Sequence, residues 1–198
     1  MADKNFSKML AGFRPPVEHR GEVVVIGLGR FGSSLASTLI DMGHEVLGLD
    51  ADADRVQQHA GILTHVAHAD TTNEQTLRQL GGGDAVTAVV AIGADVEASV
   101  LTTGALVDLG VPNISAKALT KPHGRILERV GAHHVVFPEA DMGARVARLV
   151  TGALIEYFAL DDDFVLVETR VPKNLAGMKL GDTDLRATYK VTVVCIKP

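Results

Sequence analysis

Cysteine is nearly absent from this chain, which has one, Cys195, among 198 residues. A single thiol excludes an internal disulfide and a zinc site built from cysteines. Because Cys195 lies within an apolar run, we expect it to be a core residue. The histidines give no zinc site either: His133–His134 and His65 with His68 lack ligand spacing on one helix face, so we expect them to be structural or exposed.

Long hydrophobic runs and clustered positive charge are missing as well. The apolar runs are far too short to span a bilayer, and the polar N-terminus lacks the apolar segment of a secretory signal. We therefore expect a cytosolic chain without membrane insertion. The chain has 19 Lys and Arg against 24 Asp and Glu, a net charge of −5, and no basic block, so we expect no nucleic-acid partner.

The most informative stretch runs from Glu22 to Asp50. Its apolar β-branched run, Val23–Ile26, is typical of a strand, and the sequence GLGRFG follows at Gly27–Gly32. A helical pattern comes next and closes at Gly43, and a second strand ends in Asp50. A strand, a glycine turn, a helix and a second strand with a terminal acid form the arrangement of a dinucleotide-binding unit.

The residue types of this stretch suit a nucleotide. Gly27 permits the tight turn, Gly29 lets the backbone approach a phosphate, and Gly32 lets the helix pack on the strand. The helix N-terminus offers N–H groups and a partial positive charge to the anion. Asp50 is placed to accept hydrogen bonds from both ribose hydroxyls. The alternative, a purely structural turn, is disfavoured because all parts of the arrangement are present.

Two further residues of the turn, Arg30 and Phe31, are candidates for nucleotide contacts. The Arg30 guanidinium can reach terminal phosphate oxygens bidentately, and the alternative is a solvated surface arginine. Asp50 is followed by Ala51 and Asp52, with no nearby cation to receive a ribose 2′-phosphate. NADP is therefore disfavoured.

Later strands supply the remaining candidates for nucleotide binding. Asp70 and Thr71 end the third predicted strand at the carboxyl edge of the sheet, where the adenine should lie. The alternative for either residue is a plain helix N-cap. Lys117 ends the fifth predicted strand and faces the same crevice by topology, and its alternative is a solvated lysine.

From Glu22 to about residue 150, strand and helix patterns alternate without interruption. Six parallel strands with right-handed crossovers predict a doubly wound, Rossmann-like α/β sheet. The length allows this one domain and a small appendage. The later predicted strands are 62–69, 88–92, 114–118 and 134–137, and the predicted helices between them are 53–60, 73–80, 96–109 and a segment through Ile126 and Val130.

The pattern changes after a helix predicted from Met142 to Tyr157. We expect a strand at 164–168, a helical piece around 180–185 and a strand at 191–196, which together begin a small α+β lobe. Two strands alone are marginal in water, so this partial lobe must pair with another chain or be cut short. The predicted division is a flexible arm (1–20), a nucleotide-binding lobe (21–142), a crossover and dimerisation helix (143–160) and a partial C-terminal lobe (161–198).

The chain carries separate segments that match one family: GLGRFG (27–32), MGHEVL (42–47), AIGA (91–94), LTT (101–103), VGA (130–132) and PEADMG (138–143). From about Glu22 to Ile196 it resembles the regulator-of-potassium-conductance family, the cytosolic nucleotide-binding subunits of Ktr- and Trk-type potassium transporters. The resemblance implies a homodimer that assembles into an octameric ring under a membrane pore subunit, at the inner face of the cell membrane. It also implies that ATP and ADP favour different ring shapes.

Glu139 follows Pro138 at the end of the sixth predicted strand. The resemblance implies that Glu139 lies at the dimer interface near the phosphates and binds a divalent cation. A hard carboxylate beside triphosphate oxygens suits Mg²⁺ or Ca²⁺. The alternative is a cap for a helix that starts near Asp141.

The competing interpretation is an NAD-dependent dehydrogenase, which keeps NAD among the possible ligands. The nucleotide-binding units occupy the chain to about residue 150 and leave no substrate domain to supply a general acid. The sequence also has no GxSxG elbow and no GxxxxGK[ST] loop. We therefore expect a protein that is not an enzyme. A third interpretation, a nucleotide-sensing module unrelated to transport, differs from a gating subunit only in its membrane partner.

Overall fold

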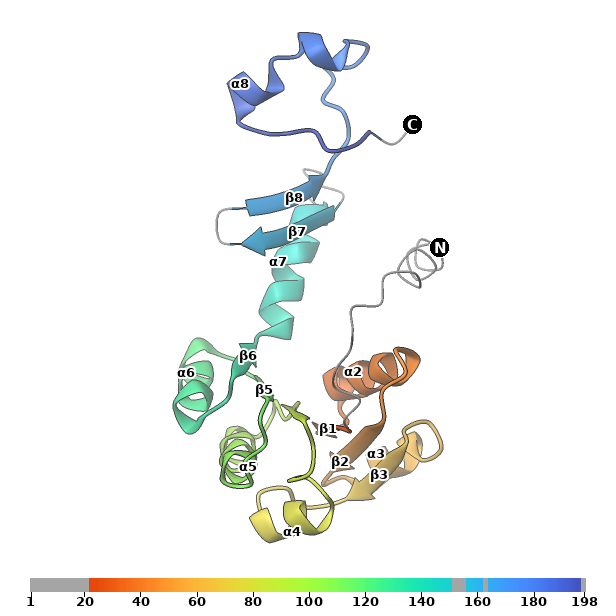
Figure 1. The fold of residues 1–198 in the computed structure, drawn as a ribbon, viewed down its shortest axis with the longest axis vertical. Coiled ribbons are helices and arrows are strands. Elements are labelled where there is room, and N and C mark those ends of the chain that lie inside the picture. The colour runs from red at the N-terminus through yellow and green to blue at the C-terminus, as the bar shows by residue number, and fades with distance from the viewer. Residues whose placement is uncertain (1–21, 151–155, 162–163, 197–198) are drawn as a thin grey trace. The chain divides into compact units, whose positions relative to one another are not determined.

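A six-stranded sheet forms the centre of the larger part of the chain. The computed structural model describes residues 22–150, 156–161 and 164–196. The strand order is β3-β2-β1-β4-β5-β6, and all neighbouring strands are parallel (Figure 1). This confirms the doubly wound fold. The strands are β1 (Val23–Ile26), β2 (Val46–Asp50), β3 (His65–His68), β4 (Thr87–Val90), β5 (Ile114–Lys117) and β6 (His134–Val136).

Helices connect these strands, and most of them begin at a side chain that caps the helix. The helices are α2 (Arg30–Asp41), α3 (Ala53–His59), α4 (Glu74–Gln79), α5 (Val96–Asp108) and α6 (Lys121–Val130). Asp52, Asn73, Asp95 and Thr120 accept hydrogen bonds from the first N–H groups of α3, α4, α5 and α6. Only α2, among these five, begins at a glycine, Gly29, without a side-chain cap.

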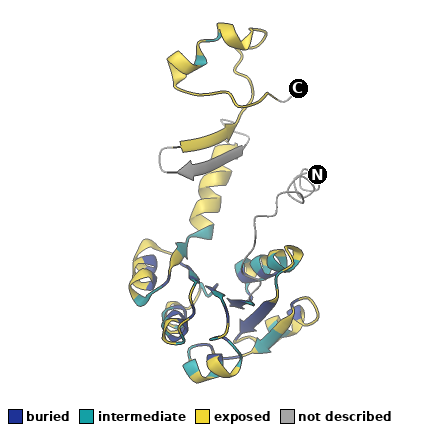
Figure 2. Ribbon diagram, viewed as in Figure 1, coloured by how far each residue is buried: buried dark blue, intermediate teal, exposed yellow. Residues whose placement is uncertain are grey.

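The sheet is covered on both faces, as Figure 2 shows by its buried centre. Alternate residues of β1 point to opposite faces, so Val24 and Ile26 belong to one hydrophobic cluster and Val23 and Val25 to another. The first cluster includes residues of α4, α5 and α6, and the second includes residues of α2. β1 and β2 are buried along their whole length, whereas the edge strands β3 and β6 are partly exposed.

The strand β3 is much shorter than its apolar pattern predicts. β3 was expected from Ile62, yet it begins at His65. The Ile62 amide donates to the carbonyl of His59 at the end of α3, so these residues form a turn and Ile62 stays exposed. A local hydrogen bond thus outweighs the β propensity of a single isoleucine.

The chain divides between Ala140 and Asp141 into two compact units. The later elements are α7 (Pro138–Val150), β7 (Glu156–Asp161), β8 (Phe164–Glu168), a 3₁₀ turn η1 (Leu180–Asp182) and α8 (Leu185–Tyr189). β7 and β8 form an antiparallel two-stranded sheet. Among the described residues, no helix combines the length and apolar character needed to cross a membrane.

Two boundaries of the predicted helix Met142–Tyr157 are wrong. The helix begins earlier, at Pro138, because proline suits the first helical position, where its missing N–H costs nothing. It does not reach Tyr157, because Glu156–Asp161 pairs as β7 with β8. Residues 151–155, 162–163 and the predicted N-terminal arm lie outside the described residues.

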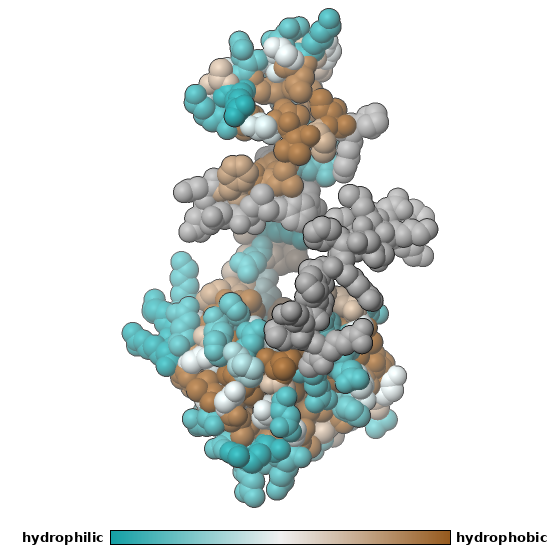
Figure 3. Space-filling view, in the orientation of Figure 1, coloured by the Kyte–Doolittle hydropathy of each residue, from teal (hydrophilic) through white to brown (hydrophobic). Residues whose placement is uncertain are grey.

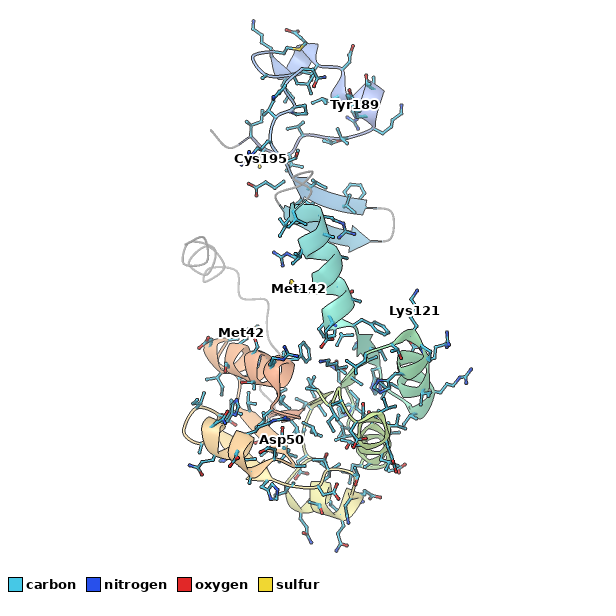
Figure 4. The ribbon with its side chains drawn as sticks, turned by 180° about the vertical axis from the view of Figure 1, so that it is seen from behind. Met42, Asp50, Lys121, Met142, Tyr189 and Cys195 are labelled. Atoms are coloured by element: carbon cyan, nitrogen blue, oxygen red, sulfur yellow. The ribbon has the colours of Figure 1, made fainter. Side chains whose placement is uncertain are left out.

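The predictions for the end of the chain also need correction. β8 is a strand as predicted, but its partner is β7, and the predicted strand Val191–Ile196 does not form. Without a neighbouring strand, an apolar β-branched run has no ladder to join. Cys195, labelled in Figure 4, is exposed rather than in a core.

Candidate functional site

The glycine turn at the end of β1 needs glycine at two positions for reasons of space. Gly27 has a φ of +93°, and a Cβ there would lie 3.1 Å from the Ala91 carbonyl carbon. A Cβ at Gly32 would overlap the Gly27 carbonyl oxygen. The Gly27 amide donates to the Leu49 carbonyl at 2.7 Å, which fixes the turn to β2. The turn therefore brings α2 directly against β1.

The start of α2 provides an anion-binding surface. Gly29 stands at its N-cap and has no side chain, so the first N–H groups of α2 have no side-chain cap. Arg30, the first residue of the helix, is exposed. Backbone N–H groups and the helix dipole attract negative charge at such a terminus.

Asp50, the last residue of β2, lies beside the glycine turn. Its side chain is 6% exposed at the end of β2 (Figure 4). Oδ2 accepts a hydrogen bond from the Leu28 amide at 2.6 Å, and Oδ1 accepts one from the Asp52 amide at 2.8 Å. Asp50 therefore supports the turn itself, a role that sequence reasoning missed. Each carboxylate oxygen has a further lone pair, so its predicted role as a ribose acceptor is compatible with these bonds.

Arg55 lies beside Asp50, and the expectation of no nearby cation is wrong. Its Nη1 is 3.5 Å from Asp50 Oδ2, and its Nε is 3.4 Å from Asp52 Oδ2. The spacing in the sequence could have revealed this contact. Asp52 caps α3, and Arg55, three positions later, lies on the same side of the helix.

Lys117 is buried rather than solvated. It ends β5 with 8% exposure, and its Nζ donates to Glu139 Oε1 at 2.5 Å. The same ammonium lies 5.6 Å from the centre of the Phe31 ring on α2, within the range of a cation–π contact. A Cβ at Gly93, just after β4, would lie 3.2 Å from Nζ. Lys117 thus links β5, α2 and α7 at the carboxyl edge of the sheet.

Glu139 lies in the first turn of α7, so the alternative that it caps a helix starting near Asp141 is wrong. The hydrogen bond from Lys117 lowers the pKa of the Glu139 carboxyl below its usual value, and the charge of Arg30 acts in the same direction. Glu139 is therefore an anion that two cations of the turn region stabilise.

The described residues of one chain do not build a closed metal site. No group of three His, Cys, Asp or Glu side chains that could hold a metal ion occurs among them. Glu139 offers a carboxylate just after the end of β6, and Lys117 already binds one of its oxygens. A divalent cation there would need further oxygen ligands from phosphates or from a second chain.

Asp70 and Thr71 follow β3, and neither is the N-cap of α4, which is Asn73. The Asp70 carboxylate accepts bonds from the hydroxyl and amide of Thr72, which lower the pKa of the Asp70 carboxyl. Thr71 is buried, and its hydroxyl shares a 3.0 Å hydrogen bond with Thr102 of α5. These contacts shape the loop after β3, and the adenine role of both residues stays a prediction.

Two of the predicted residues, Asp50 and Lys117, each gather partners at the carboxyl ends of their strands. On one side, Asp50 holds the Leu28 amide and Arg55. On the other side, Lys117 contacts Phe31 and Glu139. A ribose contact at Asp50 and a phosphate contact at Lys117 stay predictions.

Comparison with known proteins identifies the family. Residues 23–138 match the TrkA-N domain. The chain is 41% identical to "Ktr system potassium uptake protein C" of Bacillus subtilis strain 168, over 89% of this chain and 80% of that protein. It is 38% identical to "Ktr system potassium uptake protein A" of the same organism, with the same coverage.

A solved structure shares the fold. "GsuK channel bound to NAD" superposes with a TM-score of 0.65 at 16% identity, over 92% of this chain and 34% of that one. At this identity the similarity concerns the fold alone. The matches in sequence confirm the resemblance: the chain belongs to the TrkA-N family of regulator-of-potassium-conductance proteins.

Proposed function

We propose that the chain is a regulatory subunit of a potassium transport system, in which an adenine nucleotide at the glycine turn controls a membrane pore subunit. The observation that carries this proposal is the placement of charge beside the glycine turn: Arg30 begins α2, Lys117 ends β5, and Asp50 ends β2 and binds the Leu28 amide. The relatives named as potassium uptake proteins support a regulatory rather than an enzymatic role. The related channel structure with NAD supports a nucleotide ligand.

ATP and ADP are the proposed ligands, with NAD a further candidate. Their phosphates would lie at the start of α2, where Arg30 and the helix N–H groups meet them. The Lys117 ammonium is bound to Glu139 in the structure, so a phosphate that recruits Lys117 competes with this ion pair. Only a ligand that binds two conformations of the protein with unequal affinities shifts the equilibrium between these conformations. Because ATP has a terminal phosphate that ADP lacks, the two nucleotides can favour different conformations.

The proposed assembly is a homodimer that forms an octameric ring under the pore subunit, at the inner face of the membrane. α7 supports it with an exposed apolar face: Met142, Val146, Leu149 and Val150 are 43–78% exposed at helical spacing. Phe164–Val167 of β8 are also exposed, and Figure 3 shows apolar side chains gathered on this unit. Exposed apolar patches of this kind mark protein contacts, and a second copy of the chain is the proposed partner.

The test of gating compares ATP with adenosine monophosphate and ADP. We expect Arg30→Ala to weaken ATP binding at least about tenfold in calorimetry and to weaken monophosphate binding less, because the guanidinium reaches the terminal phosphate. Potassium flux through the reconstituted pore subunit should then lose its difference between ATP and ADP. Arg78→Ala is the matched control, since Arg78 pairs with Glu74 on α4.

If Arg30→Ala weakens the binding of ATP and of adenosine monophosphate equally, Arg30 supports the turn in general and does not contact the terminal phosphate. Identical flux under ATP and ADP in the parent protein would reject the gating role.

We also propose that Glu139, together with nucleotide phosphates, holds Mg²⁺ or Ca²⁺ at the interface of two chains. The carboxylate is an anion with a 59% exposed side chain, so it is available to a cation once Lys117 turns to the phosphates. Glu139→Gln keeps the size and removes the charge. We expect the variant to lose the effect of Mg²⁺ on ATP-dependent assembly in light scattering, whereas exposed Glu128→Gln should keep it. A Glu139→Gln protein that responds to Mg²⁺ like the parent would exclude the metal role.

A further inference from the structure

His59 is a buried polar residue that has no part in the function proposed above. It is the last residue of α3, and 7% of its surface is exposed. Its carbonyl accepts from the amides of Ile62 and Leu63 at 3.1 Å and 3.3 Å, so its backbone is fixed by the turn after the helix. A buried imidazole needs hydrogen-bond partners for its ring nitrogens, and these partners show what the residue holds in place.

The two ring nitrogens of His59 bind two different helices. Nδ1 lies 2.7 Å from the carbonyl oxygen of Arg55, one turn earlier in α3. Since a carbonyl only accepts, Nδ1 carries the proton in the neutral imidazole. Nε2 is then an acceptor, and the Ser33 hydroxyl donates to it at 2.6 Å. Ser33 belongs to α2, so the ring joins the end of α3 to the helix of the glycine turn.

Ser33 lies at the end of the first turn of α2. Its amide donates to the Gly29 carbonyl at 2.8 Å, and this hydrogen bond closes the turn. The N–H groups of Arg30–Gly32 precede this bond and have no carbonyl acceptor within the helix. A contact that fixes Ser33 therefore also fixes the direction in which these N–H groups point.

The direction of these N–H groups matters for a phosphate. Hydrogen bonds weaken steeply when their angle departs from linear, and a helix end that rotates loses several such bonds together. No side chain caps α2 at Gly29, so nothing at the N-cap itself holds the first turn by a side-chain hydrogen bond. The hydrogen bond between Ser33 and His59 holds the turn at its other end.

We propose that His59 is a positioning residue for nucleotide binding, which holds the first turn of α2 through Ser33 so that the uncapped N–H groups face the phosphates. His59 itself contacts no part of the nucleotide and acts only through α2. The proposal rests on the proposed function, because it concerns the phosphate end of the same nucleotide site.

Two replacements of His59 separate its two hydrogen bonds. Asparagine is short and can replace Nδ1 as the donor to the Arg55 carbonyl, whereas glutamine is longer and can replace Nε2 as the acceptor for Ser33. We expect His59→Asn and Ser33→Ala to raise the Kd of ATP about threefold to tenfold in calorimetry, because the bond that holds α2 is lost. His59→Gln should stay within about twofold of the parent. Ser34→Ala, which removes an exposed hydroxyl from the same helix, should bind ATP like the parent.

Urea denaturation separates positioning from a general loss of stability. His59→Asn and His59→Gln each lose one hydrogen bond of the ring, so we expect similar falls in the free energy of unfolding but different ATP affinities. The double variant Ser33→Ala/His59→Asn should bind ATP no more weakly than either single variant, because both changes remove the same bond.

Three results would overturn the inference while the proposed function stands. His59→Gln weakens ATP binding as much as His59→Asn. Ser33→Ala binds ATP like the parent. The losses of affinity in Ser33→Ala and His59→Asn add in the double variant, which would mean that the two residues act separately. If the parent binds none of ATP, ADP and NAD, the proposed function fails and the inference with it.

Discussion

Gly32→Ala is expected to lower the free energy of unfolding of the nucleotide-binding unit by about 3 kcal/mol, the upper end of the usual cost of overpacking. The new methyl group would overlap the Gly27 carbonyl oxygen and touch the Ala91 side chain. Backbone atoms held by the hydrogen bond from Gly27 to Leu49 have little freedom to move away. Alanine in place of glycine within α2 gains about 1 kcal/mol in helix propensity, which offsets only part of this cost.

Gly104→Ala is the matched control for this prediction. Gly104 lies within α5 of the same unit, and a Cβ there would meet only Val130 Cγ1 at 3.6 Å, an ordinary van der Waals contact. Urea denaturation should therefore show unchanged or slightly higher stability for Gly104→Ala. Equal stability of the two variants would show that the turn relaxes freely and that the close approach of α2 to β1 is not required.

Asp50→Ala is expected to affect both stability and nucleotide binding. The buried Leu28 amide would lose its acceptor, which costs about 1–3 kcal/mol in unfolding free energy. Loss of the ribose contacts would cost a further 1.5–3 kcal/mol in binding, or about tenfold to a hundredfold in the Kd of ATP. Denaturation and calorimetry on the same preparation measure the two effects separately.

A variant of comparable stability distinguishes the two roles of Asp50. Ile114→Val removes one buried methyl group from β5 and costs about 1 kcal/mol without touching the turn. Its ATP affinity should equal that of the parent. If Asp50→Ala is destabilised but binds ATP like the parent, Asp50 holds the turn and does not contact the ribose.

The parts of the fold that follow from local pattern were predictable from the sequence. The apolar run of β1, the glycine turn and Asp50 lie within one continuous stretch, and the periodicity of the later segments defines the six parallel strands. Elements that depend on a distant partner were not predictable. Val191–Ile196 has a strand pattern but no neighbour to pair with, whereas Glu156–Asp161 becomes a strand because β8 follows it closely. The same lack of a partner leaves Cys195 exposed.

The residues of the site likewise divide into those that the sequence predicts and those that it does not. The glycines and the terminal acid could be found by spacing, because each position in the turn has a fixed steric or chemical requirement. The ion pair between Lys117 and Glu139 joins residues 22 positions apart and became visible only in three dimensions. Arg55 was missed because the sequence was read for cations adjacent to Asp50, while a helix returns its side chain to that point one turn later.

The central position of β1 has a consequence for its amide protons. The strand is paired on both sides, by β2 and β4, and its four side chains are at most 7% exposed. Small local fluctuations do not bring these amides into contact with water, so their hydrogen exchange requires the whole sheet to open. A bound nucleotide raises the free energy of that opening by an amount that grows with the ratio of its concentration to its Kd, so exchange becomes slower. The exchange rate of a few amides in β1 therefore reports ligand binding in the native protein, without a label and without the pore subunit.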